Sequence, residues 1–229
     1  MSDVLISASG LTRYYESGEL KVVALDGVDL LIERGAYVVL AGRSGSGKTT
    51  LLNMLGGLDR PDSGSLVIAG QNLLTMSSAG RARFRLCHLG FVFQAYNLIR
   101  VLSARENVAY VLQLQGMKKK QRFQLADQWL ARVGLQGFEN RRPDQMSGGQ
   151  QQRVAVARAL ATEPDLVLAD EPTANLDSHT GESLMELMRK LNEERHTTFV
   201  IASHDPAVIA SARTLITMQD GQVIPVKAL

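Results

Sequence analysis

The stretch AGRSGSGKTTLL (41–52) places three glycines, two serines and a lysine directly before a run of helix-forming residues. It is preceded by GAYVVLAG (35–42), an apolar run of strand length that is typical of a buried parallel strand. TTLLNMLGGL (49–58) has the composition of a helix. A flexible linker would also be rich in Gly and Ser, but a linker needs neither flank. The stretch matches the phosphate-binding pattern G-x-x-x-x-G-K-[ST] at every fixed position.

This loop predicts a nucleotide site. Its backbone N–H groups and the N-terminus of the helix form a cradle for phosphates. Lys48 supplies a positive charge to the β- and γ-phosphates, and the Thr49 hydroxyl is suited to ligate Mg²⁺. The residues predicted to contact the nucleotide here are Gly42, Arg43, Ser44, Gly45, Ser46, Gly47, Lys48, Thr49 and Thr50.

A second strand ends in two carboxylates. In LVLADEP (166–172), Asp170 stands at the strand tip, where it can hold Mg²⁺ through water. Glu171 follows and is suited to polarise an attacking water. An ordinary strand end with solvated acids is the alternative, and the complete phosphate loop upstream argues against it.

The remaining pattern predicts an α/β chain. Strands are predicted at 4–8, 22–25 and 28–32, with breaks at 16–18 and 26–27, and again at 66–70. From about 77 to 161 the helical period dominates, apart from a strand at 89–94. Strands at 165–170 and 197–203 then flank a helix at 182–194, and a hairpin turns at Asp220-Gly221. Strands that alternate with helices imply a mostly parallel sheet.

The composition limits the function classes. The chain has 229 residues, 45% of them hydrophobic, and a net charge of +2, which gives no electrostatic footprint for nucleic acid. The one cysteine, Cys87, is expected to be a small core residue. No run approaches the ~18 apolar residues of a membrane span, and the first residues lack a signal-peptide layout. We expect a soluble, cytoplasmic protein that reaches a membrane only through a partner.

The most specific feature is MSGGQQQRVAVARAL (146–160). Ser147-Gly-Gly stands before a predicted helix and forms a second anion-binding N-terminus. A protein that carries out one reaction on one ATP molecule has no obvious use for two such sites. The stretch resembles the LSGGQ signature of the ABC transporter ATPases. In that family, the signature of one subunit caps the γ-phosphate that is held by the phosphate loop of another, in a head-to-tail dimer.

The resemblance covers nearly the whole chain and implies further site residues. Gln94 matches the glutamine that senses Mg²⁺ and the attacking water, and His204 matches the histidine that contacts the γ-phosphate. Tyr15 matches the aromatic residue that stacks on adenine, with Tyr14 as the alternative. Met146 replaces the usual leucine at a packing position. The remaining residues implied to contact nucleotide across the dimer are Ser147, Gly148, Gly149, Gln150 and Asp177.

The resemblance also implies a fold and a domain plan. The fold is that of a P-loop NTPase (RecA-like): a mostly parallel sheet core, an N-terminal antiparallel β-subdomain and a helical signature-motif subdomain. Residues 1–229 would be a single domain, with the helical subdomain inserted at approximately 95–160. The implied cofactors are ATP and Mg²⁺.

Several stretches, among them LGFVFQAYNLI (89–99), resemble the lipoprotein-releasing and macrolide-exporting branch, which also holds the FtsE-type ATPases. Arg100 departs from that pattern, where a proline is common. We therefore expect an ATP-dependent homodimer that drives a separately encoded membrane permease, at the inner face of the cell membrane. An FtsE-type regulatory ATPase and an importer subunit are the alternatives. The basic run MKKKQR (117–122) is either a solvated helix start or a contact to anionic lipid.

Overall fold

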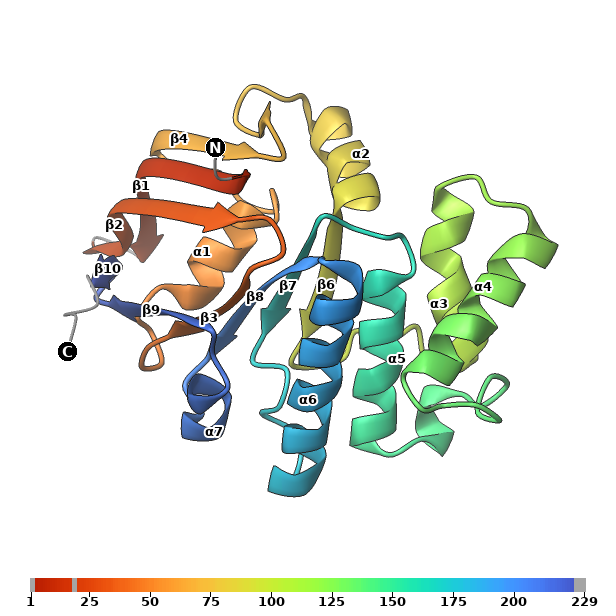
Figure 1. Ribbon diagram of the computed structural model, residues 1–229. Helices are drawn as coiled ribbons and strands as arrows, with labels where there is room; N and C mark the ends of the chain where they lie inside the picture. The colour runs from red at the N-terminus through yellow and green to blue at the C-terminus, as the bar shows by residue number, and fades with distance from the viewer. Residues whose placement is uncertain (1–2, 18–19, 225–229) are drawn as a thin grey trace.

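The computed structural model describes residues 3–17 and 20–224. Its central sheet has the strand order β10-β9-β3-β8-β7-β6 (Figure 1). The parallel strands are β3 (Tyr37–Ala41), β6 (Leu89–Phe93), β7 (Leu166–Asp170), β8 (Thr198–Ser203) and β9 (Thr214–Gln219). β10 (Gln222–Ile224) pairs antiparallel with β9, as the predicted hairpin requires. The mostly parallel core is confirmed.

A second, antiparallel sheet has the order β2-β1-β4-β5. Its strands are β1 (Val4–Ser17), β2 (Leu20–Glu33), β4 (Ser63–Ile68) and β5 (Gln71–Asn72). The prediction of three short strands before residue 33 was wrong, because Asp26-Gly27 does not end a strand. The register steps from Leu11↔Val28 to Arg13↔Leu25, so β2 absorbs one extra residue as a bulge. Residues 18 and 19, at the other predicted break, lie outside the described residues.

Helices cover both faces of the central sheet (Figure 1). α1 (Lys48–Leu55) lies between the two sheets. α5 (Gly148–Leu160), α6 (Ser178–Arg195) and the short α7 (Pro206–Ala210) lie on the opposite face. α3 (Ala104–Leu114) and α4 (Lys119–Arg132) pack outside α5, and α2 (Ser78–His88) leads into β6. A 3-10 turn at Pro143–Gln145 precedes α5.

The sheet divides the hydrophobic interior into two cores, because neighbouring side chains on a strand point to opposite faces. In β3, Tyr37 and Val39 belong to the core under α5 and α6, which also receives the α3–α4 pair. Val38 and Leu40 belong to the core shared with α1 and the antiparallel sheet. All five β3 residues are buried, which explains the continuous apolar run in the sequence.

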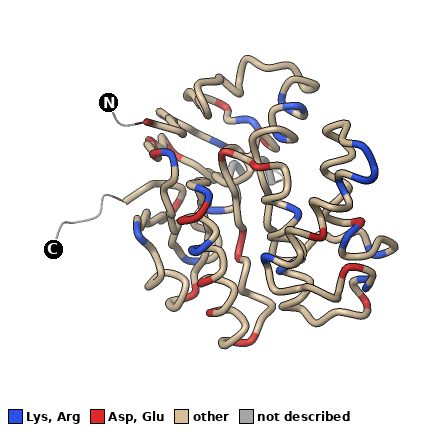
Figure 2. Tube along the Cα trace, turned by 45° about the vertical axis from the view of Figure 1, so that its right-hand side comes forward, with Lys and Arg blue, Asp and Glu red and all other residues tan. Residues whose placement is uncertain are grey.

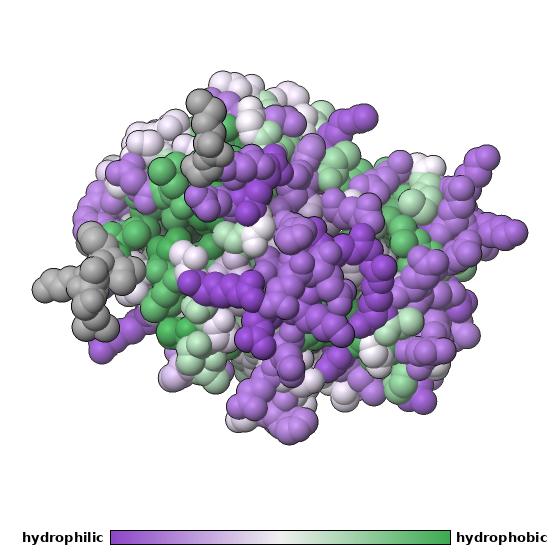
Figure 3. Space-filling view, in the orientation of Figure 1, coloured by the Kyte–Doolittle hydropathy of each residue, from purple (hydrophilic) through white to green (hydrophobic). Residues whose placement is uncertain are grey.

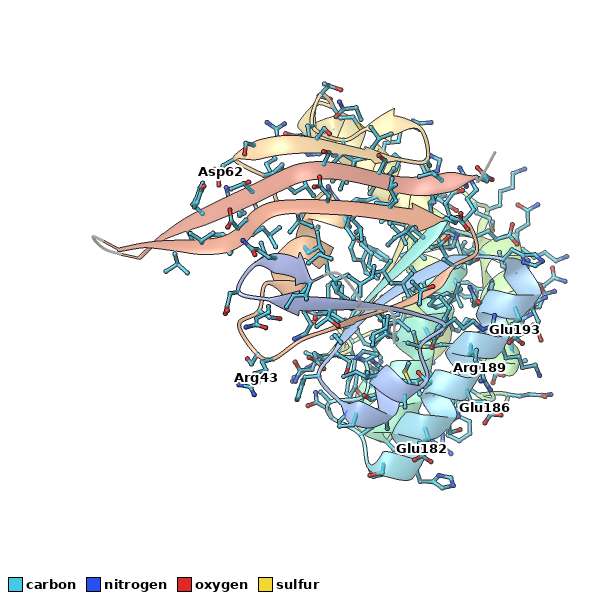
Figure 4. The ribbon with its side chains drawn as sticks, turned by 60° about the vertical axis from the view of Figure 1, so that its left-hand side comes forward. Arg43, Asp62, Glu182, Glu186, Arg189 and Glu193 are labelled. Atoms are coloured by element: carbon cyan, nitrogen blue, oxygen red, sulfur yellow. The ribbon has the colours of Figure 1, made fainter. Side chains whose placement is uncertain are left out.

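Charged side chains lie on the outer faces of α4 and α6. Glu182, Glu186, Arg189 and Glu193 project along one side of α6 (Figure 4), whereas Leu184 and Met188 of the same helix are buried. This is the amphipathic pattern of a helix packed on one side. Figure 2 shows a basic turn at the start of α4, the lysine-rich stretch of the sequence. In the described part of the chain, no helix combines the length and apolarity that a bilayer crossing requires.

The prediction that Cys87 is a core residue was wrong. Its side chain is exposed and forms no disulfide. Phe84 is the buried residue of α2. The helix therefore contacts the rest of the protein along one narrow side, and Cys87 faces away from it.

Candidate functional site

The predicted phosphate loop lies between β3 and α1. Gly47, the N-cap of α1, has a left-handed backbone with φ 100, and no side chain caps the helix. A Cβ at this position would lie 2.5 Å from the Ala24 carbonyl oxygen, so glycine is required both by the turn and by the neighbouring strand. The first N–H groups of α1 are thus left for a ligand. The Arg43 side chain points into solvent (Figure 4), so this residue can contribute to the phosphate site only through its backbone.

The predicted charged residues converge at this loop. The buried Lys48 Nζ donates to the carbonyl oxygens of Gly42 at 2.7 Å and Arg43 at 3.1 Å. It also lies 3.9 Å from a carboxylate oxygen of Glu171. The Thr49 hydroxyl donates to Asp170 at 3.0 Å. Burial raises the pKa of Asp170, although the bond from Thr49 lowers it.

Glu171 is held from two sides at the end of β7. Its carboxylate oxygens lie 2.8 Å from His204 Nδ1 and 3.3 Å from the Ser203 hydroxyl, which donates to it. The backbone of Glu171 is left-handed, with φ 45. A non-glycine residue in this region costs about 1–3 kcal/mol and is characteristic of functional sites. The carboxylate is therefore fixed next to the phosphate loop rather than left free in solvent.

These groups open into a cavity of about 390 Å³. Its lining joins the loop and α1 to Gln94, Glu171 and His204, and it extends to Tyr15. Gly42, Arg43 and Ser46 instead line a neighbouring cavity against β9 and the β9–β10 turn. The lining residues of the first cavity, within the described part of the chain, are Tyr15, Val22, Val23, Ala24, Ser44, Gly45, Gly47, Lys48, Thr49, Thr50, Gln94, Glu171, Ala174 and His204.

One end of the cavity is apolar. Tyr15 pairs with Val22 across β1 and β2, and both side chains are exposed. Figure 3 shows an apolar area over the strands at this end of the molecule. Val22, Val23 and Ala24 were missed by the sequence analysis. The available signal was the break at 16–18, since a hairpin there brings Val22 opposite the predicted Tyr15.

The aromatic ring of Tyr15 is held in place. Its hydroxyl donates to Asp59 at 2.8 Å, and the Arg13 guanidinium lies 4.8 Å from the ring centre. Tyr14, the alternative, does not line the cavity among the described residues, and its backbone N–H donates to Asp62 at 2.7 Å. The geometry therefore favours Tyr15 as the stacking residue.

The second glycine-rich turn lies elsewhere on the chain. Ser147 caps α5: its hydroxyl accepts from the Gln150 N–H at 3.3 Å, while the Gln150 side chain accepts from the Ser147 N–H at 3.0 Å. Met146 is buried, as a packing position requires. Asp177 caps α6 by accepting from the Thr180 N–H at 3.0 Å. Among the described residues, neither Ser147–Gln150 nor Asp177 lines the cavity of the phosphate loop.

The comparisons decide the family. The family model described as ABC transporter matches residues 25–174. The chain belongs to the ABC transporter family. It is 42% identical, over 97% of its own length and 94% of the relative's, to the "Lipoprotein-releasing system ATP-binding protein LolD" of Chromohalobacter salexigens. It is 44% identical over 96% of its length to the "Macrolide export ATP-binding/permease protein MacB" of Aggregatibacter actinomycetemcomitans, and it spans 34% of that longer relative.

Solved structures support the same ABC assignment. The ATP-binding cassette MJ0796, in a dimeric post-hydrolysis state bound to ADP and Pi, matches with a TM-score of 0.89 and 41% identity over 96% of both chains. The cassette cbiO1 from Clostridium perfringens, part of the cbiONQ complex, matches with a TM-score of 0.86 and 28% identity, over 97% of this chain and 87% of that one. The protein is an ABC-type ATPase cassette with the P-loop NTPase fold.

Proposed function

We propose that this cassette is the ATP-hydrolysing subunit of an export-type transporter, and that two copies enclose two ATP molecules head to tail. The observation that supports this most is the separation of two phosphate-type turns. The loop at 42–49 has a cavity, a lysine and two carboxylates beside it, whereas the turn at 147–150 has a capped helix N-terminus and does not line that cavity. A second copy would supply the missing half.

Within one half-site, the roles follow from the contacts. Lys48 and the loop backbone hold the phosphates, and Tyr15 stacks on the base. Glu171, fixed by Ser203 and His204, is the base that polarises water for attack on the γ-phosphate. His204 then lies next to both the Glu171 carboxylate and the γ-phosphate that it contacts. From the opposite subunit, Ser147, Gly148, Gly149, Gln150 and Asp177 close the site.

The donor set fits Mg²⁺. Thr49 and Asp170 present a hydroxyl and a carboxylate oxygen 3.0 Å apart beside the phosphate loop, and hard oxygen ligands of this kind suit Mg²⁺. Gln94, which lines the same cavity, adds an amide oxygen. When bound, the ion neutralises charge on the phosphates. Burial raises the pKa of Asp170, and a bound cation would oppose that shift by favouring the ionised carboxylate.

The permease is proposed to dock in an apolar groove of about 360 Å³ between α2, β6 and α3. Phe91, Ile99 and Tyr110 lie in its lining, and the last two are exposed. Val101, beside the groove in sequence, is 73% exposed. Large exposed apolar side chains of this kind mark interaction sites.

Residues 1–229 would act as one ABC ATPase domain, with 95–160 as its helical subdomain, bound to the inner face of the cell membrane through the permease. The names of the relatives favour lipoprotein, lipid or drug export as its role.

The dimer is tested with Glu171→Gln. This change keeps the size of the side chain but removes its basicity, so turnover is expected to fall by ~10²–10⁴-fold while ATP and Mg²⁺ remain bound. The uncleaved γ-phosphate then joins the two subunits. We expect the variant to be a dimer with ATP and Mg²⁺ and a monomer with ADP, measured by size-exclusion chromatography with light scattering. A dimer that is indifferent to the nucleotide would contradict the proposal.

A further inference from the structure

Two adjacent glycines begin helix α5, at Gly148 and Gly149. Glycine is a poorer helix former than alanine. Neither glycine has the left-handed backbone that excludes other residues. The local backbone therefore gives no reason for them, and the explanation lies in what surrounds them.

Gly149 lies against the first turn of α6. A Cβ at Gly149 would lie 2.4 Å from the Cγ2 methyl of Thr180. That methyl belongs to a β-branched side chain on a helix, so its rotamer is restricted. The Thr180 backbone is also held, since its N–H donates to Asp177, the cap of α6. The methyl cannot move aside cheaply.

Gly148 lies against the segment that follows Gln94. A Cβ at Gly148 would lie 2.7 Å from the Tyr96 hydroxyl, with ordinary contacts to Leu176 and Asn175 behind it. Tyr96 is anchored by α5 itself, because the Arg158 guanidinium donates to the carbonyl oxygens of Tyr96 at 3.0 Å and Asn97 at 2.5 Å. Tyr96 and Asn97 both have positive φ, so this bend is strained and is held by those bonds.

The same contacts lead back to the cavity of the phosphate loop. The Asn175 side chain donates to the Gln94 carbonyl oxygen at 2.9 Å. Gln152 of α5 is fully buried and donates to the carbonyl oxygens of Phe93 at 3.3 Å and Pro172 at 2.8 Å. The segment that carries Gln94, the segment after Glu171 and the start of α5 therefore form one hydrogen-bonded unit.

We propose that Tyr96 and Thr180 are positioning residues that fix the signature turn from within its own chain. The two glycines provide the room that these side chains need. The consequence, which rests on the proposed function, is that the segment at one nucleotide site sets the geometry that the same chain offers to the other site. Movement at Gln94 reaches Ser147 through Tyr96 and Gly148.

The test uses paired substitutions in the Glu171→Gln background. Gly149→Ala is expected to weaken the ATP-dependent dimer by about tenfold or more, because overpacking displaces the turn. Adding Thr180→Ser removes the opposing methyl and restores the dimer to within about threefold of the parent. Gly148→Ala and Tyr96→Phe form the second pair, in which the phenol oxygen is removed. Sedimentation equilibrium gives the dimer dissociation constants, and calorimetry checks that ATP binding to the monomer is unchanged.

The mismatched pairs are the controls. Gly149→Ala with Tyr96→Phe, and Gly148→Ala with Thr180→Ser, should stay as weak as the single glycine variants. If the matched pairs are no better than the mismatched ones, the glycines serve the nucleotide or the partner subunit, and the proposal is overturned. If the Glu171→Gln parent does not dimerise with ATP, the dimer hypothesis fails instead.

Thermal unfolding of the monomer without nucleotide tests the contacts independently of any dimer. Alanine in place of an unconstrained helical glycine raises the midpoint. We expect Gly149→Ala to lower it and Thr180→Ser to reverse that loss. A raised midpoint for Gly149→Ala alone would refute the contact with Thr180.

Discussion

The two glycine-rich turns, at 42–49 and 147–150, each run into the first turn of a helix, and they differ in what surrounds them. The first has a left-handed glycine as its N-cap, and Lys48, Thr49, Asp170 and Glu171 around its open N–H groups. The second has Ser147 as its N-cap, already bonded to Gln150, and glycines packed against side chains of the same chain. One turn is surrounded by charges, and the other is held by packing.

Under the proposed function, this difference gives two ways to bind the same phosphates. The first turn carries its own cation, and we propose it as the site that binds a nucleotide within one chain. The second turn has no basic residue within 147–150 and offers a hydroxyl and backbone donors. Such a surface adds little affinity alone and much selectivity for a ligand that is already positioned. Substitutions in the first turn should therefore weaken ATP binding to the monomer, whereas those in the second should weaken the dimer and leave ATP binding to the monomer unchanged.

The largest effect that separates the turns is expected from Ser147→Arg. It places an unpaired charge in the proposed interface, which costs about 3–5 kcal/mol, equivalent to a ~10²–10⁴-fold weaker dimer. Light scattering in the Glu171→Gln background should show monomer with ATP, while calorimetry shows unchanged ATP binding to the monomer. A dimer that survives this change would place the interface elsewhere.

Lys48→Ala should give the opposite result. It removes a charge-assisted contact to the phosphates worth about 1.5–3 kcal/mol, so the affinity of the monomer for ATP falls by about tenfold or more. Titration calorimetry measures this loss, with Arg43→Ala as the matched control, since that side chain points into solvent. Undiminished ATP binding by Lys48→Ala would reject the first turn as the nucleotide site.

The smallest expected effect concerns nucleotide binding at the first site alone. Tyr15→Ala should weaken ATP and GTP equally, by about 2–10-fold, because stacking of ~0.5–1.5 kcal/mol uses a face common to both bases. Tyr15→Phe should bind nearly normally despite losing the bond to Asp59. Tyr14→Ala is the matched control. If Tyr14→Ala weakens nucleotide binding and Tyr15→Ala does not, Tyr14 is the residue that stacks on the base.

The sequence predicted the first turn and its carboxylates well because strand, loop and helix are local patterns. β3, the loop and α1 follow one another without interruption, and β7 ends at Asp170 as expected. The hairpin at Asp220-Gly221 was equally local. By contrast, β1 and β2 were divided wrongly, since a bulge depends on the register of the partner strand rather than on the residues at the break.

The contacts of the second turn could not be predicted, because they join segments distant in sequence. The Ser-Gly-Gly motif does not by itself indicate that Tyr96 and Thr180 lie opposite the two glycines. The lining by Val22 and Val23 required the pairing of β1 with β2. The exposure of Cys87 depends on how narrowly α2 contacts the protein. Such features arise from tertiary packing, which local sequence patterns do not encode.

At Glu171, the left-handed backbone lowers the stability of the fold, while the side chain is proposed to act in turnover. Asparagine and glycine adopt this backbone more readily than glutamate does. An engineer who chose residues to suit each backbone angle would replace Glu171, and would thereby remove the carboxylate that is proposed as the base in ATP hydrolysis. The carboxylate lies beside the phosphate loop on this unfavourable backbone, so under the proposed role the rate of hydrolysis and the stability of the fold cannot both be optimised at Glu171.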